Sequence, residues 1–325
     1  MSSLQQLPQS AEVYARAQRA EIGAAAHAVK RIWSGMGENF DSSFLTVGPH
    51  LLAVLDEAQL RVATGALEYV PTVLADTGQT RSLTPRYDLD PRVLVGTAGD
   101  GLPTEGLAYE AVITAKSSVK QGASVAQALR DGSQFLTAAV GTLLSDTGRT
   151  AEKVAMNSRP VTGYVRMLNP PSCGRCVVLA GKRSKVGVAF DRHPKCDCRN
   201  IPASESIAGD LLVDPRAHLD SLSDDELAKT LGSRANAQAY RDGADMNQLI
   251  NAYRKSGGVS TAQVFGRTVK YTTEATTKRG LYGRAARAVG RDPARTPRLM
   301  PESIYQIATS KADADRLLQL YGWIT

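Results

Sequence analysis

The spacing of apolar residues predicts that the first half of the chain is almost entirely helical. Apolar positions recur every three or four residues, which places them on one face of each helix. Ser10 stands where the first helix needs an N-cap, Pro49 fits the first turn of the second helix, and Pro71 should kink or end that helix. A stretch rich in Gly, Thr, Asp and Pro at 75–105 is expected to be a long loop. The predicted helices are 10–34, 49–70, 105–118 and 124–157.

From residue 160 onward the pattern becomes mixed. β-branched and aromatic residues predict short strands, and two helix starts carry clear capping signals, Asp214 before Pro215 and Ser223 before Glu226. The predicted strands are 161–167, 262–266 and 269–273. The predicted helices are 214–222, 223–231, 234–242, 245–254 and a final amphipathic helix, 301–321.

These elements predict an α+β protein that is predominantly α. We expect an N-terminal helical domain, then a small α+β domain with a cysteine knuckle, then a basic segment followed by a C-terminal amphipathic helix. The corresponding segments are 1–159, 160–275 and 276–325.

Composition narrows the class of protein. The chain has 325 residues, of which 42% are hydrophobic and 22% charged, as in ordinary globular proteins. No run of about 18 apolar residues occurs, so no membrane-spanning helix is expected. The first thirty residues hold no unbroken apolar core, so no secretory signal is expected either.

The net charge of +7 is unevenly distributed. Basic blocks at 151–200 and 251–300 alternate with acidic stretches, and in the second block only Glu274 and Asp292 oppose the cations. Tyrosines interleave with these cations, which suits non-specific double-stranded DNA; an acidic protein surface such as a portal, or a simply solvated face, would also explain the charge. The candidate DNA- or portal-binding residues are Arg267, Lys270, Lys278, Arg279, Arg284, Arg287, Arg291, Arg295 and Arg298. If 282–290 is helical, the three arginines at 284, 287 and 291 share one face.

All four cysteines cluster in one segment, which favours a metal site over a spread of disulfides. Cys173 and Cys176 have the spacing of a metal knuckle, and Cys196 and Cys198 direct their thiols to the same side of an extended chain. The intervening residues can fold back as a helix and a strand. His193 could replace one of the thiols. Such a soft, tetrahedral set suits a structural zinc ion.

Other chemistry for the cysteines remains open. Two disulfides or free buried thiols are alternatives, and a redox C-x-x-C lacks the βαβ surroundings of thioredoxin-like proteins. A catalytic zinc would need an open position and a base, and no His-Glu-x-x-His pattern exists. His193 precedes Pro194, so its backbone is expected to be extended, and its side chain could equally satisfy the turn by a hydrogen bond.

The string MLNPPSCGRCVVLAGK, followed by FDRHPKCDCRNIPA, resembles the phage Mu F-like minor head proteins, a family that includes head morphogenesis proteins. Their signature is a paired-cysteine turn, an apolar helix with Gly, then an aromatic residue followed by His-Pro-x-Cys-x-Cys. Here the signature falls on Cys173, Cys176, Leu179, Gly181, Phe190, His193, Pro194, Cys196 and Cys198. More widely, VTGYVRMLNPPSCGRC, RDGADMNQLINAYR and the C-terminal segment look like head proteins of actinobacterial tailed phages, which are often labelled capsid maturation protease.

The resemblance implies a minor head protein that associates with the portal protein and the major capsid protein and acts in head assembly and DNA packaging or ejection. It would then lie in the virion, in the capsid interior or neck, and in the host cytoplasm during assembly, without contact with a membrane. A host-side DNA-binding protein is disfavoured because no recognised DNA-binding motif is present.

The alternative is a capsid maturation protease, and the enzyme question stays open with a non-enzymatic role preferred. Ser172, Asp191 and His193 could supply a triad, but no G-x-S-x-G elbow appears. Of the other histidines, His27 and His50 are expected to be structural or solvated, and His218 is expected to face solvent.

Overall fold

The three-dimensional structure, a computed structural model, is predominantly α with two small antiparallel sheets, which confirms the predicted fold class. It divides into two compact units. The helical unit holds the described residues of 6–169 and 182–212, and the C-terminal unit those of 170–181 and 213–325. The three segments expected from the sequence stay a prediction. The structure describes residues 8–168, 172–181, 183–187, 199–203, 214–253, 258–264, 266–274, 281–293 and 295–324.

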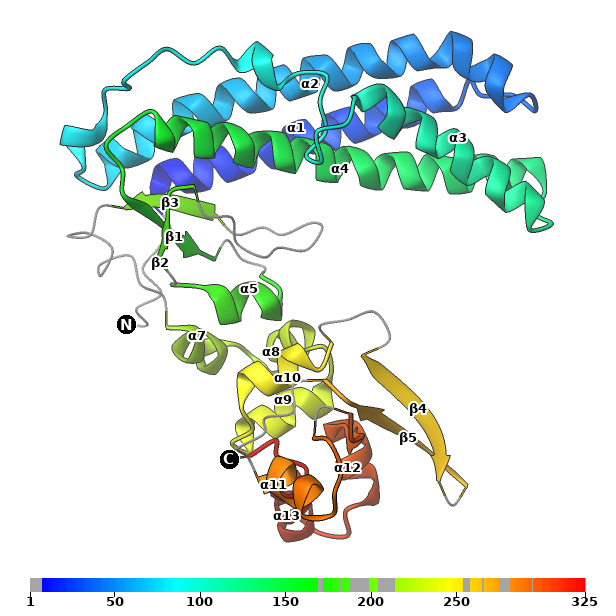
Figure 1. The fold of residues 1–325 in the computed structure, drawn as a ribbon, viewed down its shortest axis with the longest axis vertical. Helices are drawn as coiled ribbons and strands as arrows, with labels where there is room; N and C mark the ends of the chain where they lie inside the picture. Colours follow the sequence, from blue (N-terminus) through cyan, green and yellow to red (C-terminus); the bar gives the residue numbers. More distant parts are fainter. Residues whose placement is uncertain are drawn as a thin grey trace. The chain divides into compact units, whose positions relative to one another are not determined.

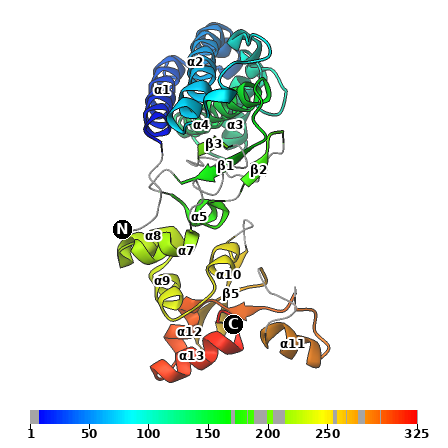
Figure 2. The same cartoon turned by 90° about the vertical axis from the view of Figure 1, so that its left-hand side faces the viewer.

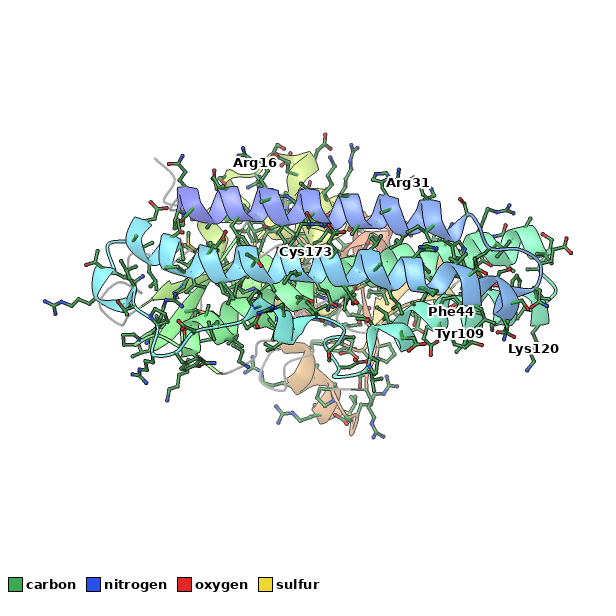
Figure 3. All side chains as sticks on the ribbon, turned by 90° about the horizontal axis from the view of Figure 1, so that it is seen from above. Arg16, Arg31, Phe44, Tyr109, Lys120 and Cys173 are labelled. Carbon is green, nitrogen blue, oxygen red and sulfur yellow. The ribbon has the colours of Figure 1, made fainter. Side chains whose placement is uncertain are left out.

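Four long helices form the helical unit (Figures 1 and 2). They are α1 (Gln9–Trp33), α2 (Phe40–Asp76), α3 (Thr104–Lys120) and α4 (Val125–Asn157). Their apolar stripes meet in one core. Near one end of the bundle Phe44 packs edge-on against Tyr109, with ring centroids 5.3 Å apart (Figure 3). Fully buried side chains of this core are Leu51, Leu55, Leu136, Val140 and Leu144.

The ends of the first two helices differ from the prediction. Ser10 is not a cap: it lies inside α1, and its N–H and hydroxyl donate to Asp76 Oδ2 at the end of α2, at 3.1 and 2.8 Å. α2 begins after Asn39, whose side chain accepts from the N–H of Ser42, and it continues through both prolines. Each proline removes one backbone hydrogen bond, but buried side chains flank both positions along α2, so burial outweighs the loss.

The predicted long loop between α2 and α3 is confirmed, and the buried side chain of Gln59 fastens it to the bundle. The Gln59 amide donates to the carbonyls of Leu94 and Thr97, at 3.3 and 2.9 Å, and to Thr147 Oγ1 at 3.0 Å. Its oxygen accepts from the N–H of Gly96 at 2.9 Å. A single buried polar side chain thus bonds two carbonyls and one N–H of the loop and holds it against α2 and α4. The loop contains two 3-10 turns, η1 (Thr80–Ser82) and η2 (Pro91–Leu94).

A three-stranded sheet belongs to the same unit. The strand predicted at 161–167 is β1 (Gly163–Met167), all of it buried, with β2 (Arg183–Lys185) and β3 (Arg199–Ala203) antiparallel on its two sides. β3 packs against the helices: Tyr69 of α2 donates its hydroxyl proton to the carbonyl of Asn200 at 3.2 Å.

The first part of the C-terminal unit consists of short helices, and the two capping signals predicted there are confirmed. Asp214 accepts from the N–H of Arg216, with Pro215 in the first turn, and Ser223 and Glu226 form a reciprocal capping box. The helices are α5 (Gly174–Leu179), α7 (Pro215–Ser221), α8 (Asp224–Leu231), α9 (Arg234–Arg241) and α10 (Met246–Asn251).

The rest of this unit is a second sheet with three helices beside it. β4 (Val259–Val264) pairs with β5 (Arg267–Thr272), which pairs with β6 (Arg298–Leu299). α11 (Leu281–Ala288) precedes β6. The predicted final helix at 301–321 is two helices instead, α12 (Pro301–Ile307) and α13 (Lys311–Leu320). The break arises because Ala308 is extended and the hydroxyl of Ser310 caps α13 by accepting from the N–H of Asp313 at 3.1 Å.

None of the helices in the described part of the chain is long and apolar enough to cross a membrane.

Candidate functional site

Two of the predicted metal ligands, Cys173 and Cys176, converge at the start of α5. Their Sγ atoms are 3.2 Å apart, and the N–H of Cys176 points at Cys173 Sγ, 3.4 Å away. Cys176 is almost fully buried, whereas Cys173 is partly exposed. Gly174 between them is required by space, because a Cβ there would lie 2.6 Å from the carbonyl oxygen of Thr230. The predicted tight turn with both sulfurs facing one point is therefore present.

The Cys173 and Cys176 thiols are ligands of the kind that a soft, tetrahedral metal ion prefers. A zinc ion with Zn–S bonds of ~2.3 Å holds two sulfurs ~3.8 Å apart, so a small opening of the Cys173–Cys176 pair would admit it. Among the residues that the structure describes, no group of three or more His, Cys, Asp or Glu side chains could hold a metal. The other predicted ligands, His193, Cys196 and Cys198, lie outside the described residues, so the four-thiol set stays a prediction.

Arg175, which lies between the two cysteines, was missed by the sequence analysis. Its guanidinium donates to the carbonyl oxygen of Tyr253, just beyond α10. The Tyr253 hydroxyl in turn accepts from Asn236 Nδ2 at 3.1 Å and donates to Glu302 Oε1 at 3.3 Å. Burial, with the charge of Glu302, raises the pKa of Tyr253 to about 12, so this phenol stays protonated. A polar network within the C-terminal unit thus anchors the cysteine turn to Tyr253, just beyond α10, and to α12, which no local pattern in the sequence could reveal.

Two of the predicted cation-site arginines lie on α11. Arg284 and Arg287 are exposed and separated by three residues on this amphipathic helix, which confirms their common face. Arg291 is exposed too, but the helix ends at Ala288 and Gly290 follows with φ of +73°, so Arg291 does not continue the helical face. Neither Arg284 nor Arg291 makes an ion pair with any residue in the described ranges.

The other described basic residues of the predicted set lie outside this helix. Arg267 and Lys270 are exposed on β5, and Arg295 is exposed before β6. Lys270 reaches the half-buried Glu302 at 3.7 Å, and Arg295 reaches the exposed Asp292 at 3.9 Å; both contacts are long, and the second contributes little to stability. Lys278 and Arg279 lie outside the described residues.

Arg298 does not belong to this surface, which corrects the prediction. Its side chain is only 1% exposed, and its guanidinium donates to Gln248 Oε1 at 2.7 Å and stacks 3.8 Å from the ring centroid of Trp323. Burial lowers the pKa of Arg298 to about 10, so it remains charged at neutral pH. Its position in a short strand, followed by the apolar Leu299 and Met300, is the sequence signal for a core residue.

The protease hypothesis rests on three residues, of which the structure describes one. Ser172 Oγ is buried and has no hydrogen-bond partner among the described residues. Asp191 and His193 lie outside them, so the triad is untested. His218 is buried, not solvent-facing as expected, and its Nδ1 lacks a partner in the described part of the chain. Burial lowers the pKa of His218, only partly offset by Glu226. His27 and His50 are exposed, as expected.

Comparison of the chain with protein-family models, with curated proteins and with solved structures finds no match in any of the three.

Proposed function

We propose that this protein is a minor head protein of a tailed bacteriophage that associates with the portal or the inner capsid and acts in head assembly and in DNA packaging or ejection. The observation that carries the proposal is the convergence of Cys173 and Cys176, at 3.2 Å, in the tight turn where the resembled family has its paired cysteines. The aromatic-His-Pro-x-Cys-x-Cys half of the signature follows in the sequence.

Contact with packaged DNA or with the portal would use the cationic face of α11. Arg284 and Arg287 are exposed on this helix and Arg291 is exposed just beyond its end, while Arg267, Lys270 and Arg295 are further exposed cations of the same unit. Cations of this kind bind phosphate backbones without reading a base sequence, because each contact releases condensed counterions. Such binding fits a protein that meets a whole genome during packaging or ejection.

A structural zinc ion would be held by Cys173 and Cys176 together with thiols or the imidazole from 193–198. It would supply a cross-link between the Cys173–Cys176 turn and the segment 193–198. This chain's own contribution is to hold the first two thiols in register, through Gly174 and the Arg175 hydrogen bond to Tyr253.

Co-expression with the portal protein encoded in the same genome tests the association. We expect the full chain to co-purify with assembled portal in moderate salt. A variant that removes the two α11 arginines and the one just beyond the helix, Arg284→Gln with Arg287→Gln and Arg291→Gln, should be recovered in lower yield. If neither the portal nor the major capsid protein retains the wild-type chain, the proposed role in the head is wrong.

A further inference from the structure

The sheet of the C-terminal unit has one closed edge and one open edge. The far side of β5 is closed, because β6 pairs with Tyr271 and Thr272. The backbone of Lys270 is satisfied on the same side, where its N–H donates to Ser303 Oγ at 2.6 Å and its carbonyl accepts from the N–H of Met300 at 2.9 Å. β4 pairs with β5 along all six of its residues, but no strand in the described ranges pairs with its outer edge (Figure 1).

The sequence of β4 offers none of the usual protection for such an edge. Exposed edge strands are commonly blocked by charged side chains, proline or a bulge. β4 reads Val-Ser-Thr-Ala-Gln-Val, with no charge and no proline, and it pairs with β5 in an unbroken register. Alternate residues of an antiparallel edge strand direct their N–H and C=O groups outward, so β4 presents a template for another strand.

We infer that the outer edge of β4 pairs with β4 of a second copy of this chain, forming an antiparallel sheet continuous across a twofold axis. The charge pattern of the β4–β5 hairpin suits this occupant. The hairpin's cations, Arg267 and Lys270, lie on β5, so β4-to-β4 pairing places uncharged residues against uncharged residues. The two β5 strands become the outer strands, about 14 Å apart at strand spacings of ~4.8 Å, beyond the reach of strong repulsion in physiological salt.

The twofold axis fixes the possible registers. For antiparallel neighbours it must run perpendicular to the sheet, so each residue keeps its face, and one residue lies opposite its own copy. The axis then falls at Thr261 or at Ala262, near the centre of the strand. Opposed Cα atoms in such pairs lie about 4.5–5.5 Å apart, a separation that a disulfide can span. This inference goes beyond the proposed role in the phage head and does not depend on it.

The oligomeric state of the full chain tests the inference. We expect wild-type protein to be a concentration-dependent dimer in sedimentation equilibrium. Thr261→Glu should raise the dimer dissociation constant at least roughly tenfold, because like charges then meet across the axis. The hairpin itself should survive, since residue 261 lies opposite Lys270. The matched control Thr268→Glu places the same charge on β5, away from the axis, and should leave the dimer intact.

Cross-linking identifies the surface. Under mild oxidation, Thr261→Cys or Ala262→Cys should form a disulfide-linked dimer, while Thr268→Cys and the wild-type chain should not. A wild-type chain that stays monomeric at its solubility limit overturns the inference. A dimer that tolerates Thr261→Glu and cross-links at neither position overturns it as well, since the chain would then associate through another surface. Retention of a different protein by a monomeric chain would assign the edge to that partner and reject self-pairing.

Discussion

The guanidinium of Arg298 lies 3.8 Å from the centroid of the Trp323 ring, in the core of the C-terminal unit. This contact joins β6 to the end of the chain after α13. The Trp323 indole N–H also donates to the carbonyl of Leu299 at 2.8 Å, and Arg298 Nη1 reaches the carbonyl of Tyr321 at 3.3 Å. A charged residue expected on the surface is thus the centre of the packing between β6 and the C-terminus.

Replacing Arg298 should therefore destabilise the C-terminal unit rather than weaken ligand binding. Arg298→Gln removes the cation that stacks on the Trp323 ring, and the shorter side chain cannot donate to Gln248 Oε1. We expect a loss of about 2–4 kcal/mol in the free energy of unfolding of this unit, as for other broken buried polar networks. Urea unfolding monitored by tryptophan fluorescence measures it. Arg284→Gln, the same change at an exposed position, should alter stability by less than about 0.5 kcal/mol.

The pH dependence of stability should carry the signature of His218. Its folded-state pKa is lowered by burial, so the unfolded chain binds a proton more readily than the folded chain below an ordinary histidine pKa of 6.5. Stability then rises with pH through this window and is lost as pH falls below about 6.5. His218→Gln should flatten this part of the profile, measured as urea midpoints of the full chain between pH 7.5 and 5.5. A variant whose profile superimposes on that of the wild type would show that His218 does not titrate differently on folding.

The cationic face of α11 should govern non-specific DNA binding. Replacing Arg284, Arg287 and Arg291 with Gln should weaken affinity for double-stranded DNA equally for all sequences. It should also make the salt dependence shallower by up to about 0.9 per lost phosphate contact. Fluorescence anisotropy at several salt concentrations measures both quantities.

The control for this experiment is an equal change of charge elsewhere. Arg16, Arg19 and Arg31 are exposed on α1, two of them visible at its outer edge in Figure 3. Their replacement with Gln should leave DNA binding nearly unchanged. If both triple variants lose affinity equally, net charge rather than the α11 face is responsible; if the α11 variant loses only the portal, its partner is protein.

The cysteine pair predicts the metal content of the protein. Full-length chain purified without chelator should carry about one zinc ion, and Cys176→Ser should lose it, since a thiolate ligand is removed. Elemental analysis gives the number of zinc ions per chain. In the Cys176→Ser variant, hydrogen exchange should be faster than in the wild type around α5, and this increase should be larger than in the four-helix bundle. Ser172→Ala, beside the same turn, should retain the metal. Wild-type protein free of metal after expression in zinc-supplemented medium would leave the thiols free or disulfide-bonded.

Much of the helical architecture follows from local sequence signals. Asp214, Ser223 and Glu226 were recognised because a cap is specified by a few neighbouring residues. Pro49 and Pro71 misled the prediction for the opposite reason: local chemistry disfavours them inside a helix, but the burial of α2 against its neighbours is a tertiary effect.

The candidate site could be predicted only in part. The spacing of Cys173 and Cys176 predicts a tight turn, and the structure contains this turn. Arg175 and Tyr253 are joined by a hydrogen bond across 78 positions of the sequence, so no local pattern links them. The number of basic residues in a segment likewise does not distinguish the buried Arg298 from the exposed Arg284. It records how many cations the segment contains but not which of them are buried in the fold.

Mass spectrometry of purified phage particles from the genome that encodes this chain tests the central claim most directly. We expect the chain to be retained in intact, DNA-filled heads at a copy number far below that of the major capsid protein, whose N-terminus should be unprocessed. Ser172→Ala should change neither result. Absence of the chain from mature heads, together with a major capsid protein trimmed at its N-terminus, would contradict the account and assign the chain to capsid maturation instead.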